Sequence, residues 1–144
     1  MKQILLLSFT LMLAFGGMTA EAKNPKKTTK PANAVVAEKK VEVYYFHFTR
    51  RCKTCMAVEA NAQKAIEALY ADKVKSGIYT FKGLNLDDAS TDAIAKKLGV
   101  GGQALMVVSG NNKVDITSKG FMNANDLEKM KEEVKKAVDN VIKG

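Results

Sequence analysis

The sequence predicts an α/β domain in which helices cover both faces of a mixed central sheet. Between residues 41 and 108, runs rich in β-branched and aromatic residues alternate with stretches of helical periodicity. Such alternation is typical of parallel strands joined by right-handed crossovers. After the run that ends at residue 108, a Gly-Asn-Asn turn leads into one further strand-like run, which predicts an antiparallel hairpin before a last helix.

The first predicted strand spans residues 41–48 and is apolar almost throughout. We expect a central strand covered on both faces, since such strands lose the usual polar alternation. A helix is expected over residues 54–74, ended by Gly77. Its helically spaced stripe contains Cys55, Val58, Ala62, Ala65, Ile66, Leu69 and Tyr70.

The second half of the domain is predicted in the same way. Strands are expected over residues 78–86, 104–108 and 113–118, with a short helix ending at Leu98 between the first two. The last helix should begin at Asn125, with Glu128 completing a capping box. Its expected buried stripe contains Leu127, Met130, Val134, Ala137, Val138 and Val141.

Residues 1–22 are typical of a secretory signal peptide. Lys2 precedes an apolar run from Ile4 to Phe15, and Ala20-Glu21-Ala22 fits a cleavage site. An uncleaved anchor is the alternative, although the apolar run is shorter than the roughly 20 residues that span a bilayer. We therefore expect a periplasmic or secreted protein, in a compartment where disulfides persist.

Residues 23–40 predict a disordered linker, and residues 41–144 the folded domain. The linker holds both prolines of the chain, six lysines and one glutamate, so it carries +5 of the total net charge of +8. Its charge would suit a membrane surface or nucleic acid, but we favour a soluble spacer. The remaining +3 gives little support to nucleic-acid binding.

The only two cysteines, Cys52 and Cys55, lie between the first predicted strand and the first predicted helix. In an exported domain, a Cys-x-x-Cys pair at this position indicates thiol–disulfide chemistry. A purely structural disulfide stays open, although such a short loop gains little entropic stabilisation. A soft-metal site also stays open, because Cu(I) accepts two thiolates and Met56 is adjacent.

These features resemble the thioredoxin-like superfamily over about residues 38–143. The segments "FHFTRRCKTCMAVE" and "GQALMVV" are similar to a small exported bacterial group, the nitrophenyl compound nitroreductase subunit of ArsF type. The resemblance implies a thioredoxin-like fold, with residues 98–108 forming the loop and strand that face the cysteines. If the group's nitroreductase activity holds, another subunit should carry the flavin or metal.

Two positions depart from the superfamily's pattern. Ala104 stands where these oxidoreductases usually have a cis-proline, and a cis bond before a non-proline residue costs about 2.5–4 kcal/mol, so we expect a trans bond. Phe46 stands where thioredoxin has a buried aspartate that takes a proton. No acid lies between Glu42 and Glu59, so proton handling should differ.

We expect Cys52 to be the attacking thiol and Cys55 the buried resolving thiol. The helix N-terminus and the cations Arg50, Arg51 and Lys53 should favour the Cys52 thiolate, as at sites where the thiol pKa falls from about 8.5 to roughly 3.5–7.5. A low pKa stabilises the reduced form, which favours an oxidising pair.

Substrate contacts are expected from Arg51, Lys53 and the backbone of Gly102, Gln103 and Ala104, which would offer an edge to an extended peptide. The expected partner is a disulfide- or dithiol-bearing protein, with a membrane reductant as a further candidate. We expect a monomer that binds no nucleic acid and no organic cofactor. His47 lies in an apolar run, which favours a structural role for this side chain.

Overall fold

The computed structural model describes residues 38–144, so the predicted signal peptide and all but the last three linker residues lie outside the described residues. No helix within the described range is both long and apolar enough to cross a membrane. The elements are β1 (Val41–His47), α1 (Lys53–Leu69), α2 (Ala71–Lys75), β2 (Tyr79–Asn85), the 3-10 turn η1 (Ala89–Thr91), α3 (Asp92–Leu98), β3 (Ala104–Ser109), β4 (Asn112–Asp115), α4 (Thr117–Met122) and α5 (Leu127–Lys143).

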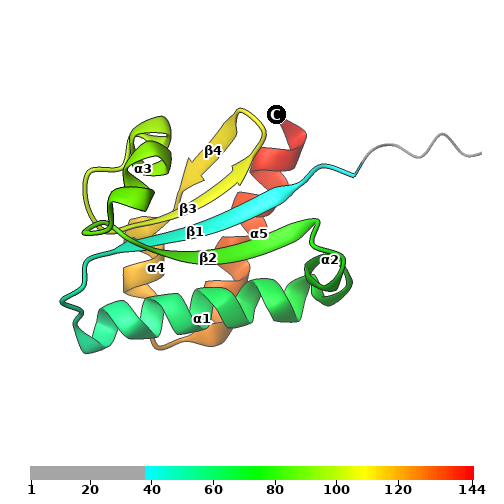
Figure 1. Ribbon diagram of the computed structural model, residues 1–144. Helices are drawn as coiled ribbons and strands as arrows, with labels where there is room; N and C mark the ends of the chain where they lie inside the picture. The colour runs from blue at the N-terminus through cyan, green and yellow to red at the C-terminus, as the bar shows by residue number, and fades with distance from the viewer. Residues whose placement is uncertain (1–37) are drawn as a thin grey trace, which may run out of the picture. The chain divides into compact units, whose positions relative to one another are not determined.

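The four strands form one mixed sheet in the order β2-β1-β3-β4 (Figure 1). β1 runs parallel to β2 and antiparallel to β3, and β3 pairs with β4 in the predicted hairpin. Gly110 in the hairpin turn has a φ of 59°, a conformation that glycine adopts without steric cost. This architecture confirms the predicted α/β thioredoxin-like fold.

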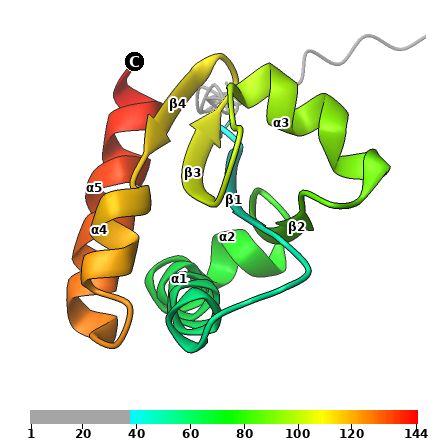
Figure 2. The same cartoon turned by 90° about the vertical axis from the view of Figure 1, so that its left-hand side faces the viewer.

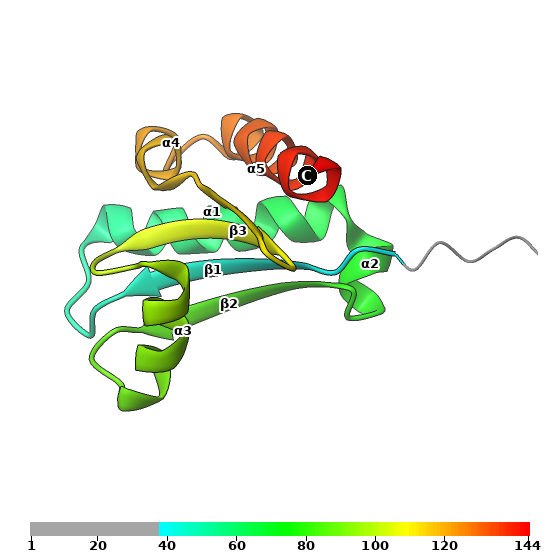
Figure 3. The same cartoon turned by 90° about the horizontal axis from the view of Figure 1, so that it is seen from above.

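The central strand β1 is covered on both faces, as its continuous apolar run predicts (Figure 3). Val43 and Tyr45 pack into the larger core, to which α1 and α5 contribute. Tyr44 and Phe46 point to the other face and pack with Ala95 and other residues of α3. The alternation of side chains along β1 therefore places Tyr45 and His47 on the α1 face of the sheet.

The predicted helix over 54–74 is two helices, with a break at Tyr70. The backbone of Tyr70 leaves the helical region with a φ of −138°, and its ring packs on Tyr79 with centroids 5.0 Å apart. The tertiary contact thus overrides the helical periodicity, which continues through Tyr70 into Val74.

The fourth strand and the last helix are both present, but one predicted boundary of each is wrong. The fourth strand ends at Asp115, because the Asp115 carboxylate accepts a hydrogen bond from the Thr117 backbone N–H at 2.8 Å and α4 begins at Thr117.

The packing of α4 and the start of α5 each depend on one residue. Gly120 allows α4 to approach the sheet, since a Cβ at this position would lie 2.9 Å from Leu105 Cδ2. The last helix is capped by Asp126, which accepts from the Lys129 N–H at 3.1 Å, and so begins later than Asn125.

The last predicted linker residues contact the domain. The carboxylate of Glu38 pairs with Lys73 at 2.7 Å, and Lys39 Nζ donates to the carbonyl of Ile142 at 2.8 Å. These contacts fasten the chain immediately before β1 to both α2 and α5.

Candidate redox site

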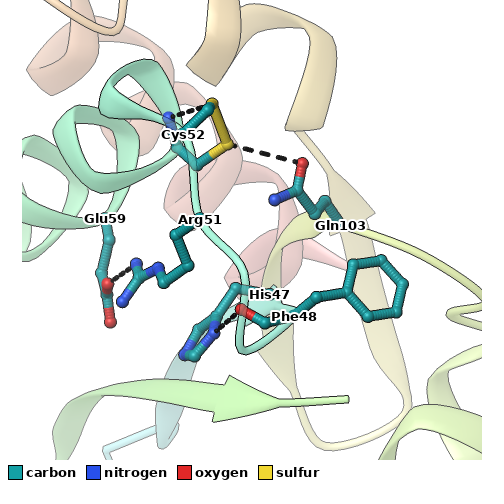
Figure 4. A network of polar contacts seen from close by, with 7 residues as sticks. His47, Phe48, Arg51, Cys52, Glu59 and Gln103 are labelled. Atoms are coloured by element: carbon teal, nitrogen blue, oxygen red, sulfur yellow. Dashed lines mark hydrogen bonds and ion pairs between the residues drawn. A yellow bond between two sulfur atoms is a disulfide. The ribbon is translucent and has the colours of Figure 1, made fainter. Parts of the chain in front are cut away.

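The two cysteines form a disulfide at the junction between β1 and α1 (Figure 4). Cys52 is the N-cap of α1, and its Sγ accepts a hydrogen bond from the Cys55 backbone N–H at 3.0 Å. Cys52 is exposed whereas Cys55 is 5% exposed. The more exposed cysteine is therefore at the very start of the helix, and its partner is buried one turn inside.

The start of α1 carries positive charge and no negative charge. Lys53 is the first helical residue, and no acidic side chain lies in the first turn. The unpaired backbone N–H groups of a helix N-terminus add a partial positive charge at the same point. After reduction, this environment favours the thiolate of Cys52, which is the nucleophilic form of the thiol.

Gln103 faces the disulfide from the loop before β3 (Figure 4). Its Oε1 lies 3.8 Å from Cys55 Sγ. The adjacent residue Ala104 is buried, pairs with Phe46 across the sheet, and follows a trans peptide bond, since the residues described contain no cis bond. The expected trans bond at Ala104 is confirmed.

Two hollows meet at Gln103. One, with a volume of about 550 Å³, is lined by Phe48, Arg50, Arg51, both cysteines and Gln103. The other, of about 180 Å³, is lined by residues 98–104 together with Met106 and Asp115. A surface depression therefore continues from the disulfide across Gln103 to Gly102 and Ala104.

Arg51 turns away from solvent and pairs with Glu59, one turn beyond Cys55 on α1 (Figure 4). Their side chains are only 22% and 23% exposed. The carboxylate lies against β2 at Gly83, where any Cβ would collide with it. Glycine inside a strand is a sign of such close approach.

Sequence reasoning did not select Glu59. It lies eight residues after Arg51, across the boundary between a loop and a helix, so no regular spacing relates the two residues. The one signal available in the sequence is Gly83 inside a predicted strand, because a glycine there indicates that another group approaches the backbone closely.

Two buried polar atoms at this ion pair have no hydrogen-bond partner among residues 38–144. They are Tyr45 Oη and Arg51 Nε, both buried and without a partner in the described part of the chain. The Arg51 guanidinium carbon lies 5.9 Å from the centroid of the Tyr45 ring. Burial raises the pKa of Tyr45; nearby Arg51 opposes this shift and Glu59 adds to it. The Tyr45 hydroxyl therefore stays protonated at neutral pH.

The loop leading to Cys52 is fastened to the end of β2. The Thr49 backbone N–H donates to Asp87 Oδ2 at 2.8 Å, and Asn85 Nδ2 donates to Thr49 Oγ1 at 2.9 Å. The hydrogen bonds from Thr49 lower the pKa of Asp87. One residue before the loop, His47 Nδ1 lies 3.0 Å from the carbonyl oxygen of Phe48.

The structure brings most predicted site residues together. Arg51, Cys52, Cys55 and Gln103 line the larger hollow, while Gly102 and Ala104 line the smaller one. Lys53 is exposed at the start of α1 and lines neither hollow. Among residues 38–144, no three His, Cys, Asp or Glu side chains are grouped as a metal site would require.

Comparisons with known proteins name no relative. The chain matches no family model, no curated protein and no solved structure.

Proposed function

We propose that this chain is an exported thiol–disulfide oxidoreductase or electron-transfer protein that cycles the Cys52–Cys55 pair between dithiol and disulfide. One observation carries the proposal: an exposed cysteine caps a 17-residue helix, and its buried partner lies one turn later beside an open hollow. This asymmetry suits an attacking and a resolving thiol.

The exchange proceeds in two steps. The Cys52 thiolate attacks one sulfur of a substrate disulfide, which forms a mixed disulfide and releases the other substrate sulfur as a thiolate that takes up a proton. Cys55 then loses its proton and attacks Cys52 Sγ, which restores the disulfide seen here and releases the second substrate thiol. Two electrons pass from the protein to the substrate, and the same steps in reverse oxidise a dithiol partner.

A purely structural bridge is the competing explanation. A disulfide that closes so short a loop contributes little entropy, since the stabilisation grows with loop length. A structural bridge would also gain nothing from an exposed cysteine at a helix N-terminus. These two arguments favour the redox assignment.

The proposal extends to location and partners. The signal-like residues 1–22 support action in the periplasm or outside the cell. The partner is a protein with a disulfide or dithiol, and a membrane reductant could recharge the pair. The ArsF-type likeness would add a separate subunit carrying the flavin or metal.

Trapping of the mixed disulfide tests the function. Reduced Cys55→Ala protein is mixed with bis(2-hydroxyethyl) disulfide, a small neutral probe, and intact mass is followed. We expect a stable adduct on Cys52, and a much slower adduct in the Cys52→Ala control, because Cys55 is buried. Equal adduct rates in the two variants, or no adduct in either, would overturn the proposal.

A further inference from the structure

The residues that flank the two cysteines along the chain combine exposed positive charge with exposed apolar surface. Four of them define the site rim: Phe48 and Arg50 in the loop before Cys52, and Lys53 and Met56 in the first turns of α1. All four are exposed. Figure 4 shows the Phe48 ring extending from the loop on the side of Gln103.

The apolar part of the rim is unusual for this domain. Only three large hydrophobic side chains are exposed within residues 38–144: Phe48 at 40%, Met56 at 49% and Met122 at 75%. Single exposed hydrophobic residues need no explanation. Two of the three, however, lie within four residues of a cysteine of the pair.

The charged part of the rim is not neutralised by neighbours. Arg50 and Lys53 form no ion pair with any described residue, whereas the adjacent Arg51 is paired with Glu59. Asp87 accepts a hydrogen bond from Thr49, the residue before Arg50, and forms no ion pair with either cation. The rim therefore presents two free cations to an approaching partner.

We propose that the site rim recognises a cysteine-bearing peptide segment with acidic residues beside its cysteine and an apolar residue next to them. Opposite charges steer the encounter and fix its register. The acidic side chains would meet Arg50 and Lys53, and the apolar one would pack on Phe48 and Met56. This inference rests on the proposed function, since the bound cysteine must undergo exchange with Cys52.

Matched peptide disulfides test the inference. Three short peptides carry one cysteine flanked by Glu, Gln or Lys on both sides, with a leucine at the next position. Each is presented as its symmetrical disulfide, and the rate at which the reduced full chain attacks it is measured at low and high salt. We expect the Glu peptide to react at least about 10-fold faster than the Lys peptide at low salt, with a smaller ratio at high salt because salt screens exposed charges.

A double variant assigns the preference to the rim. In Arg50→Gln/Lys53→Gln, we expect the ratio of the Glu-peptide rate to the Gln-peptide rate to fall about 3-fold or more, since each exposed pair contributes up to about 1 kcal/mol. Lys64→Gln/Lys75→Gln changes the net charge equally at exposed lysines elsewhere, on α1 and α2. This control should keep the wild-type ratio.

A changed peptide and a second double variant of the protein test the apolar contact. Replacing the leucine of the Gln peptide by serine should slow its reaction with the wild-type protein. In the protein variant Phe48→Ala/Met56→Ala, the leucine and serine peptides should react at more similar rates. The inference is wrong if the Glu and Lys peptides react at the same rate at low salt. It is also wrong if Arg50→Gln/Lys53→Gln and Lys64→Gln/Lys75→Gln give the same ratio of the Glu-peptide rate to the Gln-peptide rate. Failure of the neutral Gln peptide and of the small neutral probe to react at all would instead remove the proposed function.

Discussion

Arg51 and Glu59 form an ion pair that is about three-quarters buried beneath the disulfide, with Gly83 leaving space for the carboxylate. The pair joins the loop before Cys52 to the second turn of α1, so it spans the two segments that hold the cysteines. We therefore expect that breaking this ion pair would both lower the stability of the domain and disturb the position of the cysteines.

Glu59→Gln should destabilise the domain by about 1–3 kcal/mol, because it leaves a largely buried guanidinium without its charged partner. Urea unfolding of the oxidised protein measures the change. The control is Glu67→Gln on the same helix. Glu67 accepts only a solvent-exposed hydrogen bond from Gln63, so this change should lower the free energy of unfolding by about 0.5 kcal/mol or less. Equal costs for both variants would mean that the buried pair contributes nothing.

Gln103→Leu should slow the resolving step and affect the first attack much less. The Gln103 amide lies 3.8 Å from Cys55 Sγ, and after reduction it can rotate to donate a hydrogen bond to the Cys55 thiolate. Loss of one bond to a charged group corresponds to about 1.5–3 kcal/mol, or a factor of at least about 10 in rate. Stopped-flow measurement of the two steps separates them, with the exposed Gln63→Leu as control; unchanged resolution would exclude the contact.

The loop that carries Cys52 should loosen at acid pH. Hydrogen bonds from Thr49 lower the pKa of Asp87 below its ordinary value of 3.8. The ionised carboxylate therefore holds the loop at pH values above 3.8, and this contribution is lost as the pH falls through the lowered folded-state pKa. The protection factor of the Thr49 amide against hydrogen exchange should fall in that window.

Two neighbouring variants provide the control for this pH effect. Asp87→Ala should lower Thr49 protection at every pH and remove its acid dependence, because the acceptor is gone. Asp88→Ala removes a neighbouring exposed carboxylate that caps no helix through its side chain and should leave protection unchanged. Constant protection of wild-type Thr49 down to pH values well below 3.8 would contradict the proposed fastening.

Gly102→Val should leave the fold intact and slow the reaction with extended peptides. A Cβ at Gly102 would meet no atom within 4 Å, and the φ of this residue is not in the left-handed region. A branched side chain would instead occupy the depression that continues from Gln103. Rates with a peptide disulfide should fall while rates with bis(2-hydroxyethyl) disulfide stay near wild type; equal effects on both would exclude peptide binding along this backbone.

The fold was predictable because its signals are local. The uninterrupted apolar run of β1, the glycine turn at Gly110 and the helical spacing after Cys52 each follow from a few adjacent residues. The placement of Cys52 at a helix N-terminus and of Cys55 on the buried stripe follows from the same spacing.

The unpredicted features depend on contacts between distant segments. Tyr70 interrupts the helix because its ring packs on Tyr79 of β2. The Arg51–Glu59 pair needs the α1 register and the missing side chain of Gly83 at once. The hydrophobic periodicity of the sequence does not predict such contacts, so only the three-dimensional structure reveals them.

The reduction potential of the Cys52–Cys55 pair tests the central claim most directly. Metal-free protein is equilibrated in glutathione buffers of graded composition, and free thiols are counted by alkylation and mass. We predict a reversible midpoint between about −120 and −230 mV, the range of oxidants, isomerases and glutaredoxin-like carriers. A pair that stays oxidised throughout, with a potential below about −300 mV, would be a structural bridge and would contradict the redox assignment.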